Sequence, residues 1–201
     1  MNNYCPFKYC LFTNNHVLNK SNIEIGNNIN FEYYNGDKKI EIAKNRKVYT
    51  NEELDYTCIE IFESDGIINF FKLDPLIFKD DKKYLENSDI FILQYPNSNE
   101  LSFSNGKIKS LKDNKIIHNA STDHGSSGSP LIRRSKDNYI IGLHFGGIKK
   151  NEKNYLCNFA TPFDLIINDI NGIKEPINEI NCIYIFNNKN EIIYYMILIM
   201  I

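Results

Sequence analysis

Residues 123–147 read DHGSSGSPLIRRSKDNYIIGLHFGG and contain the pattern that decides the fold. A run of glycines and serines leads into SPLIRR (129–134), and the polar turn KDN separates that stretch from YIIGLHF (139–145). Short apolar runs separated by turn residues are typical of antiparallel strands. The segment therefore predicts two adjacent strands that follow a loop of small residues.

The same pattern extends over most of the chain. Further strands are expected in KYCLFT (8–13), INFEYY (29–34), KIEIA (39–43), DYTCIEI (55–61), DIFILQYP (89–96), GKIKSLK (106–112) and NYLCNFAT (154–161). One helix is predicted near the C-terminus, with Thr161 as its cap, Pro162 at its first position and Gly172 as its stop. Many strands followed by one late helix favour an all-β fold of barrels or a sandwich.

Composition excludes several classes of protein. The chain has 201 residues and a net charge of −2 without a long basic or acidic block, which argues against a nucleic-acid-binding protein. Its apolar run at 192–201 is shorter than the roughly 20 residues that span a membrane. Five cysteines without a C-x-x-C pair argue against a zinc site, and we expect neither metal nor cofactor. The N-terminus lacks the pattern of a secretory signal, which predicts a cytoplasmic protein.

Three separate segments contain candidate catalytic residues. LFTNNHVL places His16 after a strand, ELDYTCIEI places Asp55 at the start of a strand, and DHGSSGSPLI places Ser127 in the loop of small residues. Each residue alone is weak evidence, because a histidine after a strand, an aspartate before one and a Gly/Ser loop are all common. Their combination is informative: a serine needs a base to become a nucleophile, histidine can serve as that base, and a carboxylate orients the imidazole.

These segments resemble the three motif blocks of chymotrypsin-like (trypsin-like) serine peptidases, which share the order His, Asp, Ser. The resemblance implies two packed six-stranded antiparallel β-barrels with a C-terminal helix. It assigns residues 1–80 to a first barrel that carries His16 and Asp55, and residues 81–172 to a second that carries Ser127. By motif position His16 is the general base, Asp55 its orienting partner and Ser127 the nucleophile, while the N–H groups of Gly125 and Ser127 form an oxyanion hole.

A fourth segment, YIIGLHFGG, resembles the strand along which these peptidases hold their substrate. Gly146 and Gly147 would leave the specificity pocket open. His144 and Thr122 match positions that favour acidic P1 side chains in glutamyl-endopeptidase-type members. Alternatively, His144 is a histidine of the pocket wall without that role, and Asp123 argues against an acidic substrate because a carboxylate in the pocket would repel it. His118 is interpreted as an ordinary strand residue.

The chain also departs from the family pattern. Relatives usually have two further strands before the histidine motif, whereas 15 residues precede His16 here. We therefore expect an N-terminally truncated first barrel with unpaired backbone at its edge. Residues 173–201 predict an additional hairpin to which the sequence assigns no role.

Two functions stay open at this point. One is a serine endopeptidase that cleaves peptide or protein substrates through an acyl-enzyme. The other is a catalytically inactive peptidase-like module, or a truncated fragment, that binds extended peptides by strand addition. The oligomeric state is not predicted.

Overall fold

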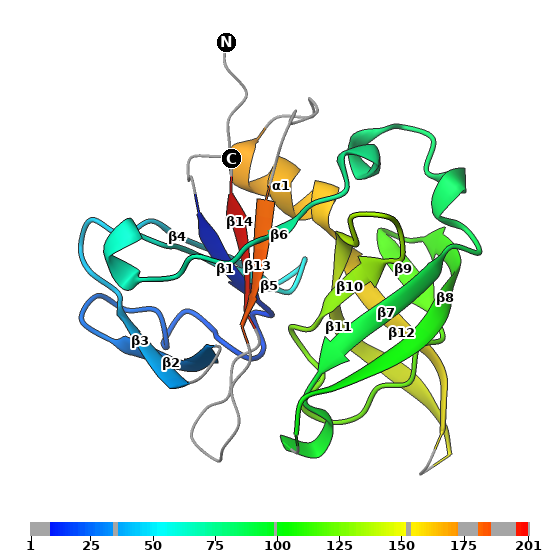
Figure 1. The fold of residues 1–201 in the computed structure, drawn as a ribbon, viewed down its shortest axis with the longest axis horizontal. Helices are drawn as coiled ribbons and strands as arrows, with labels where there is room; N and C mark the ends of the chain where they lie inside the picture. Colours follow the sequence, from blue (N-terminus) through cyan, green and yellow to red (C-terminus); the bar gives the residue numbers. More distant parts are fainter. Residues whose placement is uncertain are drawn as a thin grey trace.

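The computed structural model describes residues 9–33, 36–98, 100–151, 154–172, 181–185 and 196–200. The strands are β1 (Cys10–Thr13), β2 (Asn28–Tyr33), β3 (Gly36–Glu41), β4 (Val48–Asn51), β5 (Tyr56–Glu60), β6 (Phe71–Lys72), β7 (Asp89–Gln94), β8 (Ser102–Lys112), β9 (Lys115–His118), β10 (Pro130–Arg133), β11 (Tyr139–Asn151), β12 (Asn154–Pro162), β13 (Asn181–Ile185) and β14 (Met196–Met200). The helix α1 spans Phe163–Asn171, and short 3₁₀ turns span Glu63–Asp65, Pro75–Phe78, Lys83–Leu85 and Pro96–Ser98. Figure 1 shows two β halves side by side, with α1 extending from the barrel toward the other half.

Strands β7 to β12 close into an antiparallel barrel in the order β10-β11-β12-β9-β8-β7 (Figure 1). Along β7, the side chains of Ile90 and Ile92 are buried, whereas Asp89 lies exposed at the start of the strand. This alternation follows from the pleat, which points successive side chains to opposite faces of a sheet. The prediction of a mainly-β fold with an antiparallel barrel and a C-terminal helix is confirmed.

The first half is a six-stranded sheet in the order β4-β5-β1-β14-β13-β6, accompanied by the separate antiparallel pair β2-β3. Strand β1 pairs with β5 on one side and with β14 on the other, where Phe12 lies opposite Ile197. Strand β1 is therefore paired on both sides, and the sheet ends at β4 and β6. Backbone N–H and C=O groups need partners, and a strand from the far end of the chain supplies them as well as a neighbouring one.

The two halves share one hydrophobic core. Phe12 and Tyr56 from the first half belong to the same buried cluster as Leu143 and Phe163 from the second. The rings of Phe12 and Phe163 meet edge to face, with 5.3 Å between their centroids. Because protein interiors are close-packed, this shared core fixes how one half lies against the other.

Helix α1 begins at Phe163, one residue later than predicted, with Pro162 at the cap position. Gly172 ends it in the left-handed region at φ 61°, as predicted. The prediction that Thr161 caps the helix is wrong. Its hydroxyl instead donates a hydrogen bond of 3.1 Å to the carbonyl of Leu54 in the first half.

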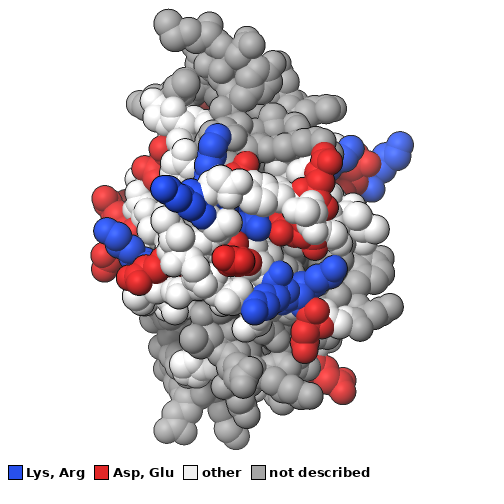
Figure 2. Space-filling view, turned by 90° about the vertical axis from the view of Figure 1, so that its left-hand side faces the viewer, with Lys and Arg blue, Asp and Glu red and all other residues white. Residues whose placement is uncertain are grey.

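Charges of both signs are mixed on the surface. Figure 2 shows one face of the first half, where Lys and Arg side chains lie among Asp and Glu side chains instead of forming one large region of a single sign. In the described part of the chain, no helix is both long and apolar enough to cross a membrane. Among the same residues, no group of three or more His, Cys, Asp or Glu side chains could hold a metal ion.

Candidate active site

His16 and Asp55 meet in a hydrogen-bonded pair although 39 positions separate them. The Oδ1 atom of Asp55 accepts a bond of 2.9 Å from the backbone N–H of His16, and its Oδ2 atom lies 2.7 Å from Nδ1 of the His16 ring. The side chain of His16 is 48% exposed and that of Asp55 is 21% exposed. A carboxylate at Nδ1 favours the tautomer with its proton on Nδ1, so Nε2 is left as an acceptor.

Asp55 lies in the turn between β4 and β5 and has a left-handed backbone conformation, with φ 49°. This region is unfavourable for residues other than glycine and persists where the surroundings hold it. The N–H of Asp55 bonds to the carbonyl of Glu52, and the Asn14 side chain donates to the carbonyl of Asp55 at 2.9 Å. The conformation that directs the carboxylate toward His16 therefore depends on neighbouring residues.

The loop that contains Ser127 is held by short-range hydrogen bonds. The N–H of Ser126 bonds to the carbonyl of Asp123, and the N–H of Asp123 bonds back to the hydroxyl of Ser126, both at 3.1 Å. The N–H of Ser129 bonds to the carbonyl of Ser126. Ser126 and Ser129 are buried, whereas Ser127 is half-buried. The loop thus leaves the Ser127 side chain accessible on a fixed backbone.

Glycines on either side of Ser127 allow the turn. Gly125 and Gly128 have φ values of 83° and 82°, in the region that favours glycine. Among the residues that the structure describes, no acceptor is assigned to the N–H of Gly125 or to that of Ser127. An oxyanion hole needs two such donors that point at one position, so these two N–H groups stay the candidates for it.

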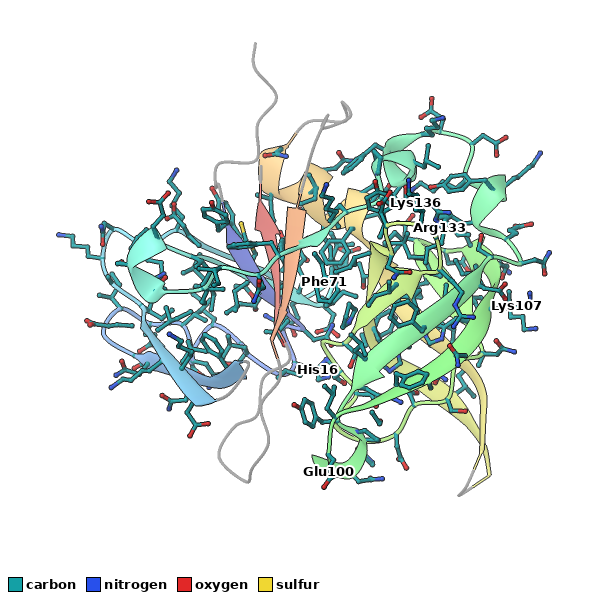
Figure 3. All side chains as sticks on the ribbon, in the orientation of Figure 1. His16, Phe71, Glu100, Lys107, Arg133 and Lys136 are labelled. Atoms are coloured by element: carbon teal, nitrogen blue, oxygen red, sulfur yellow. The ribbon has the colours of Figure 1, made fainter. Side chains whose placement is uncertain are left out.

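Strand β11 is hydrogen-bonded to the Ser127 loop. The N–H of Gly128 donates to the carbonyl of His144 at 2.9 Å, and the N–H of His144 donates to the carbonyl of Ser129 at 2.8 Å. On the other side, the charge of His16 is near enough to His144 to contribute to lowering its pKa. In Figure 3, His16 lies on the side of the first half that is turned toward the barrel. His144 is therefore bonded to the Ser127 loop through its backbone, and its ring is among the groups that the charge of His16 influences.

This geometry agrees with a comparison against known families, in which the trypsin-like peptidase domain matches residues 5–143. The chain belongs to the trypsin-like peptidase domain family. The prediction that the chain belongs to the chymotrypsin-like (trypsin-like) family is confirmed. The glutamyl-endopeptidase subtype is not confirmed by the match.

Solved structures of serine proteases have a similar fold. The serine endoprotease from Yersinia pestis matches with a TM-score of 0.61 and 16% identity, over 84% of this chain and 56% of that one. The HtrA-type protease AlgW with a decapeptide matches with a TM-score of 0.58 and 17% identity, over 84% of this chain and 50% of AlgW. This trypsin-like peptidase chain thus spans about half the length of the solved relatives it matches.

The residues predicted to bind substrate lie on β11 and in the loop between β9 and β10. Gly146 has open space beside it, because a Cβ atom placed there would meet nothing within 4 Å. Gly147 lies next to it, opposite Asn158 of β12. Thr122 is half-buried, and the adjacent carbonyl of Ser121 accepts a 3.0 Å bond from the Gln94 side chain.

Two histidines face each other inside the barrel of this peptidase domain. His144 is 2% exposed, and its Nδ1 atom lies 3.3 Å from Nε2 of the fully buried His118. Burial lowers the pKa of His144 to about 3 and lowers the pKa of His118 well below its usual value. Interpreting His118 as an ordinary strand residue missed this contact, although its spacing of two from the buried Ile116 placed it on the inward face.

The buried pair predicts that the domain loses stability in mild acid. Because both histidines have a lowered pKa in the folded chain, the unfolded chain binds more protons below about pH 6.5. The free energy of unfolding should fall from about pH 6.5 toward pH 3, by up to about 1.4 kcal/mol per pH unit for each histidine. Urea unfolding between about pH 7 and pH 5 measures this slope before most carboxylates titrate.

A glutamine at position 118 should make that slope shallower, because one of the two titrating groups is removed. The matched control is His124→Gln, which changes an exposed histidine and should leave the slope unchanged. Equal slopes for wild type and His118→Gln would contradict the prediction.

Proposed function

We propose that the chain is a serine endopeptidase that hydrolyses peptide bonds with His16, Asp55 and Ser127. The Ser127 hydroxyl attacks the scissile carbonyl while Nε2 of His16 takes its proton. The N–H groups of Gly125 and Ser127 stabilise the oxyanion. The C–N bond then breaks, His16 gives its proton to the leaving amine, and Ser127 retains the acyl group as an ester. Water then loses a proton to His16 and attacks the ester. The C–O bond to Ser127 breaks, and His16 returns the proton to the Ser127 oxygen.

The observation that carries this proposal is the double contact between His16 and Asp55. One carboxylate oxygen bonds to the backbone and the other lies 2.7 Å from the ring nitrogen, so the imidazole has little freedom to rotate. Such a pair stabilises the imidazolium that forms when the base accepts a proton. Acyl transfer also requires a site for negative charge, and the proposal is supported by the N–H groups of Gly125 and Ser127, which have no acceptor among the described residues.

A fluorophosphonate probe tests the proposal. We expect wild type to be labelled at Ser127, and Ser127→Ala or His16→Ala to lose labelling because nucleophile or base is gone. Labelling should also decrease in acid, because a protonated histidine cannot accept the proton of Ser127. The matched control is Ser121→Ala, which changes an exposed serine six positions before Ser127 and should label like wild type.

Failure of the folded wild-type chain to react at any pH would contradict the proposal. If peptides then bind wild type and Ser127→Ala equally well without being cleaved, the module that binds extended peptides is supported instead. Peptide mass spectrometry distinguishes the two outcomes, because only an endopeptidase produces internal cleavage.

We also propose that the enzyme prefers an acidic side chain at P1. Thr122, in the loop between β9 and β10, can donate a hydrogen bond to a carboxylate. The ring of His144, which its low pKa keeps neutral, lies on β11. The carboxylate of Asp123, which would repel such a substrate, already accepts bonds from the Asn97 side chain at 3.0 Å and from the His124 N–H at 2.8 Å. Both oxygens of this carboxylate are thus held by neutral donors from neighbouring loop residues.

Matched peptides with Glu or Gln at P1 test this preference. We expect kcat/KM to be about tenfold higher for the Glu peptide, and the difference to disappear in Thr122→Val. Thr122→Ser retains the hydroxyl and should retain the preference. Equal rates for both peptides would contradict the preference while leaving the peptidase proposal intact.

A further inference from the structure

The carboxylate of Asp169 on α1 connects the second half to the turn that holds Asp55. Its Oδ2 atom accepts a hydrogen bond of 2.6 Å from the Tyr56 hydroxyl and one of 3.0 Å from the Asn51 side chain. Asn51 is the last residue of β4 and Tyr56 is the first of β5, so the two donors stand at the two ends of that turn. One carboxylate oxygen therefore holds both ends together.

The middle of the same turn has a further bond to the second half. The hydroxyl of Thr161, at the end of β12, donates to the carbonyl of Leu54 at 3.1 Å. Within the turn, the N–H of Leu54 donates to the side-chain oxygen of Asn51 at 3.0 Å. Asn51 thus links Asp169 to the residue that directly precedes Asp55, whose left-handed backbone needs such support.

The position of Asp169 on the helix indicates that its carboxylate does not serve the helix itself. It lies in the last turn of α1, where the helix dipole disfavours negative charge, and no basic residue of that turn compensates it. Its partner Tyr56 is 1% exposed and lies in the core shared by the two halves. The carboxylate of Asp169 therefore stabilises the fold through its hydrogen bonds to the first half and not through the helix dipole.

We propose that Asp169 is a positioning residue for catalysis, which holds the Asp55 turn against the half that carries Ser127. Loss of its two bonds would let the turn relax, so that Asp55 no longer fixes the His16 ring in line with Ser127. This inference rests on the proposed peptidase function. It adds a residue of the C-terminal helix, far from the three motif blocks, to the machinery that orients the base.

Steady-state kinetics of Asp169→Ala test the role. We expect kcat and the rate of fluorophosphonate labelling to fall about 10- to 100-fold with KM nearly unchanged, because only the transition-state geometry suffers. Asp169→Asn keeps an acceptor oxygen of similar size and should recover activity to within about threefold of wild type. The matched control is Asp137→Ala, which removes another carboxylate bonded to a tyrosine hydroxyl, that of Tyr139 at 3.2 Å on the barrel, and should behave like wild type.

Two further readouts separate positioning from a general loss of stability. The acid limb of the pH profile of kcat/KM should move to lower pH in Asp169→Ala, since a loosely held carboxylate stabilises the imidazolium less. In proton NMR spectra, the downfield signal of the His16 Nδ1 proton should broaden or disappear in Asp169→Ala and persist in Asp137→Ala. A chain that is merely less stable would show neither change at temperatures where it stays folded.

The outcomes distinguish this inference from the proposal on which it rests. If wild type is labelled and Asp169→Ala is labelled equally fast, Asp169 has no positioning role and the peptidase function stands. If Asp137→Ala loses as much activity as Asp169→Ala, the effect is general and the inference is also wrong. If the wild-type chain does not react at all, both proposals are overturned.

Discussion

An asparagine in place of Asp55 is expected to lower kcat about 10⁴-fold while the chain stays folded, a magnitude taken from the same substitution in related serine proteases. The structure gives a specific reason for so large an effect. The backbone N–H of His16 donates to Oδ1 of Asp55, so the amide oxygen of an asparagine would take that position. Its NH₂ group would then face Nδ1 of the ring and force the proton onto Nε2. A ring protonated at Nε2 cannot accept the proton of Ser127.

The measurement is steady-state hydrolysis of a peptide ester, with thermal unfolding to verify that the variant is folded. Glu52→Gln is the control, because it neutralises an exposed carboxylate in the same turn without touching the ring. Its kcat should stay within about twofold of wild type. Retention of kcat within about tenfold in Asp55→Asn would show that His16 does not act with Asp55.

A chain that ends at Gly172 is expected to lose fluorophosphonate labelling completely. Removal of β14 leaves the backbone of β1 without a partner on one side, although the residues of β1 are fully buried. Buried N–H and C=O groups without partners are costly, and β1 leads directly to His16. Hydrogen exchange of the β1 amides, together with labelling, measures the loss.

A single substitution separates the pairing from other effects of shortening the chain. Ile197→Pro removes one N–H from the strand opposite Phe12 and should weaken both amide protection in β1 and labelling, whereas Ile197→Val should preserve both. Addition of a peptide with residues 173–201 to the shortened chain should restore part of the labelling. Wild-type labelling by the shortened chain would falsify this prediction.

The sequence predicts the strands and the family because both depend on local patterns. Alternation in segments such as DIFILQ and the small residues around Ser127 reflect requirements of a pleat or a tight turn, which neighbours in sequence satisfy. The sequence also identifies the residues that meet as His16 and Asp55, since the motif order is shared with the family.

The features that the sequence did not predict depend on contacts between segments that are distant along the chain. The hydroxyl of Thr161 could cap its own helix or bond across to Leu54, and local sequence does not decide between these two acceptors. Asp169 resembles an ordinary surface residue of a helix until its partners at positions 51 and 56 are known. Likewise, the pairing of β14 with β1 joins the two extremes of the described chain, which no short pattern reveals.

The place of β14 between β1 and β13 also has a consequence for biosynthesis. The ribosome releases residues 89–162, which contain the whole barrel, before it releases residues 196–200. We therefore expect the barrel to fold on the nascent chain before the sheet that holds His16 can be completed by β14. A nascent chain that has released the barrel but not yet β14 would carry Ser127 before the sheet around His16 is assembled, so the proposed activity would appear later than the folded barrel.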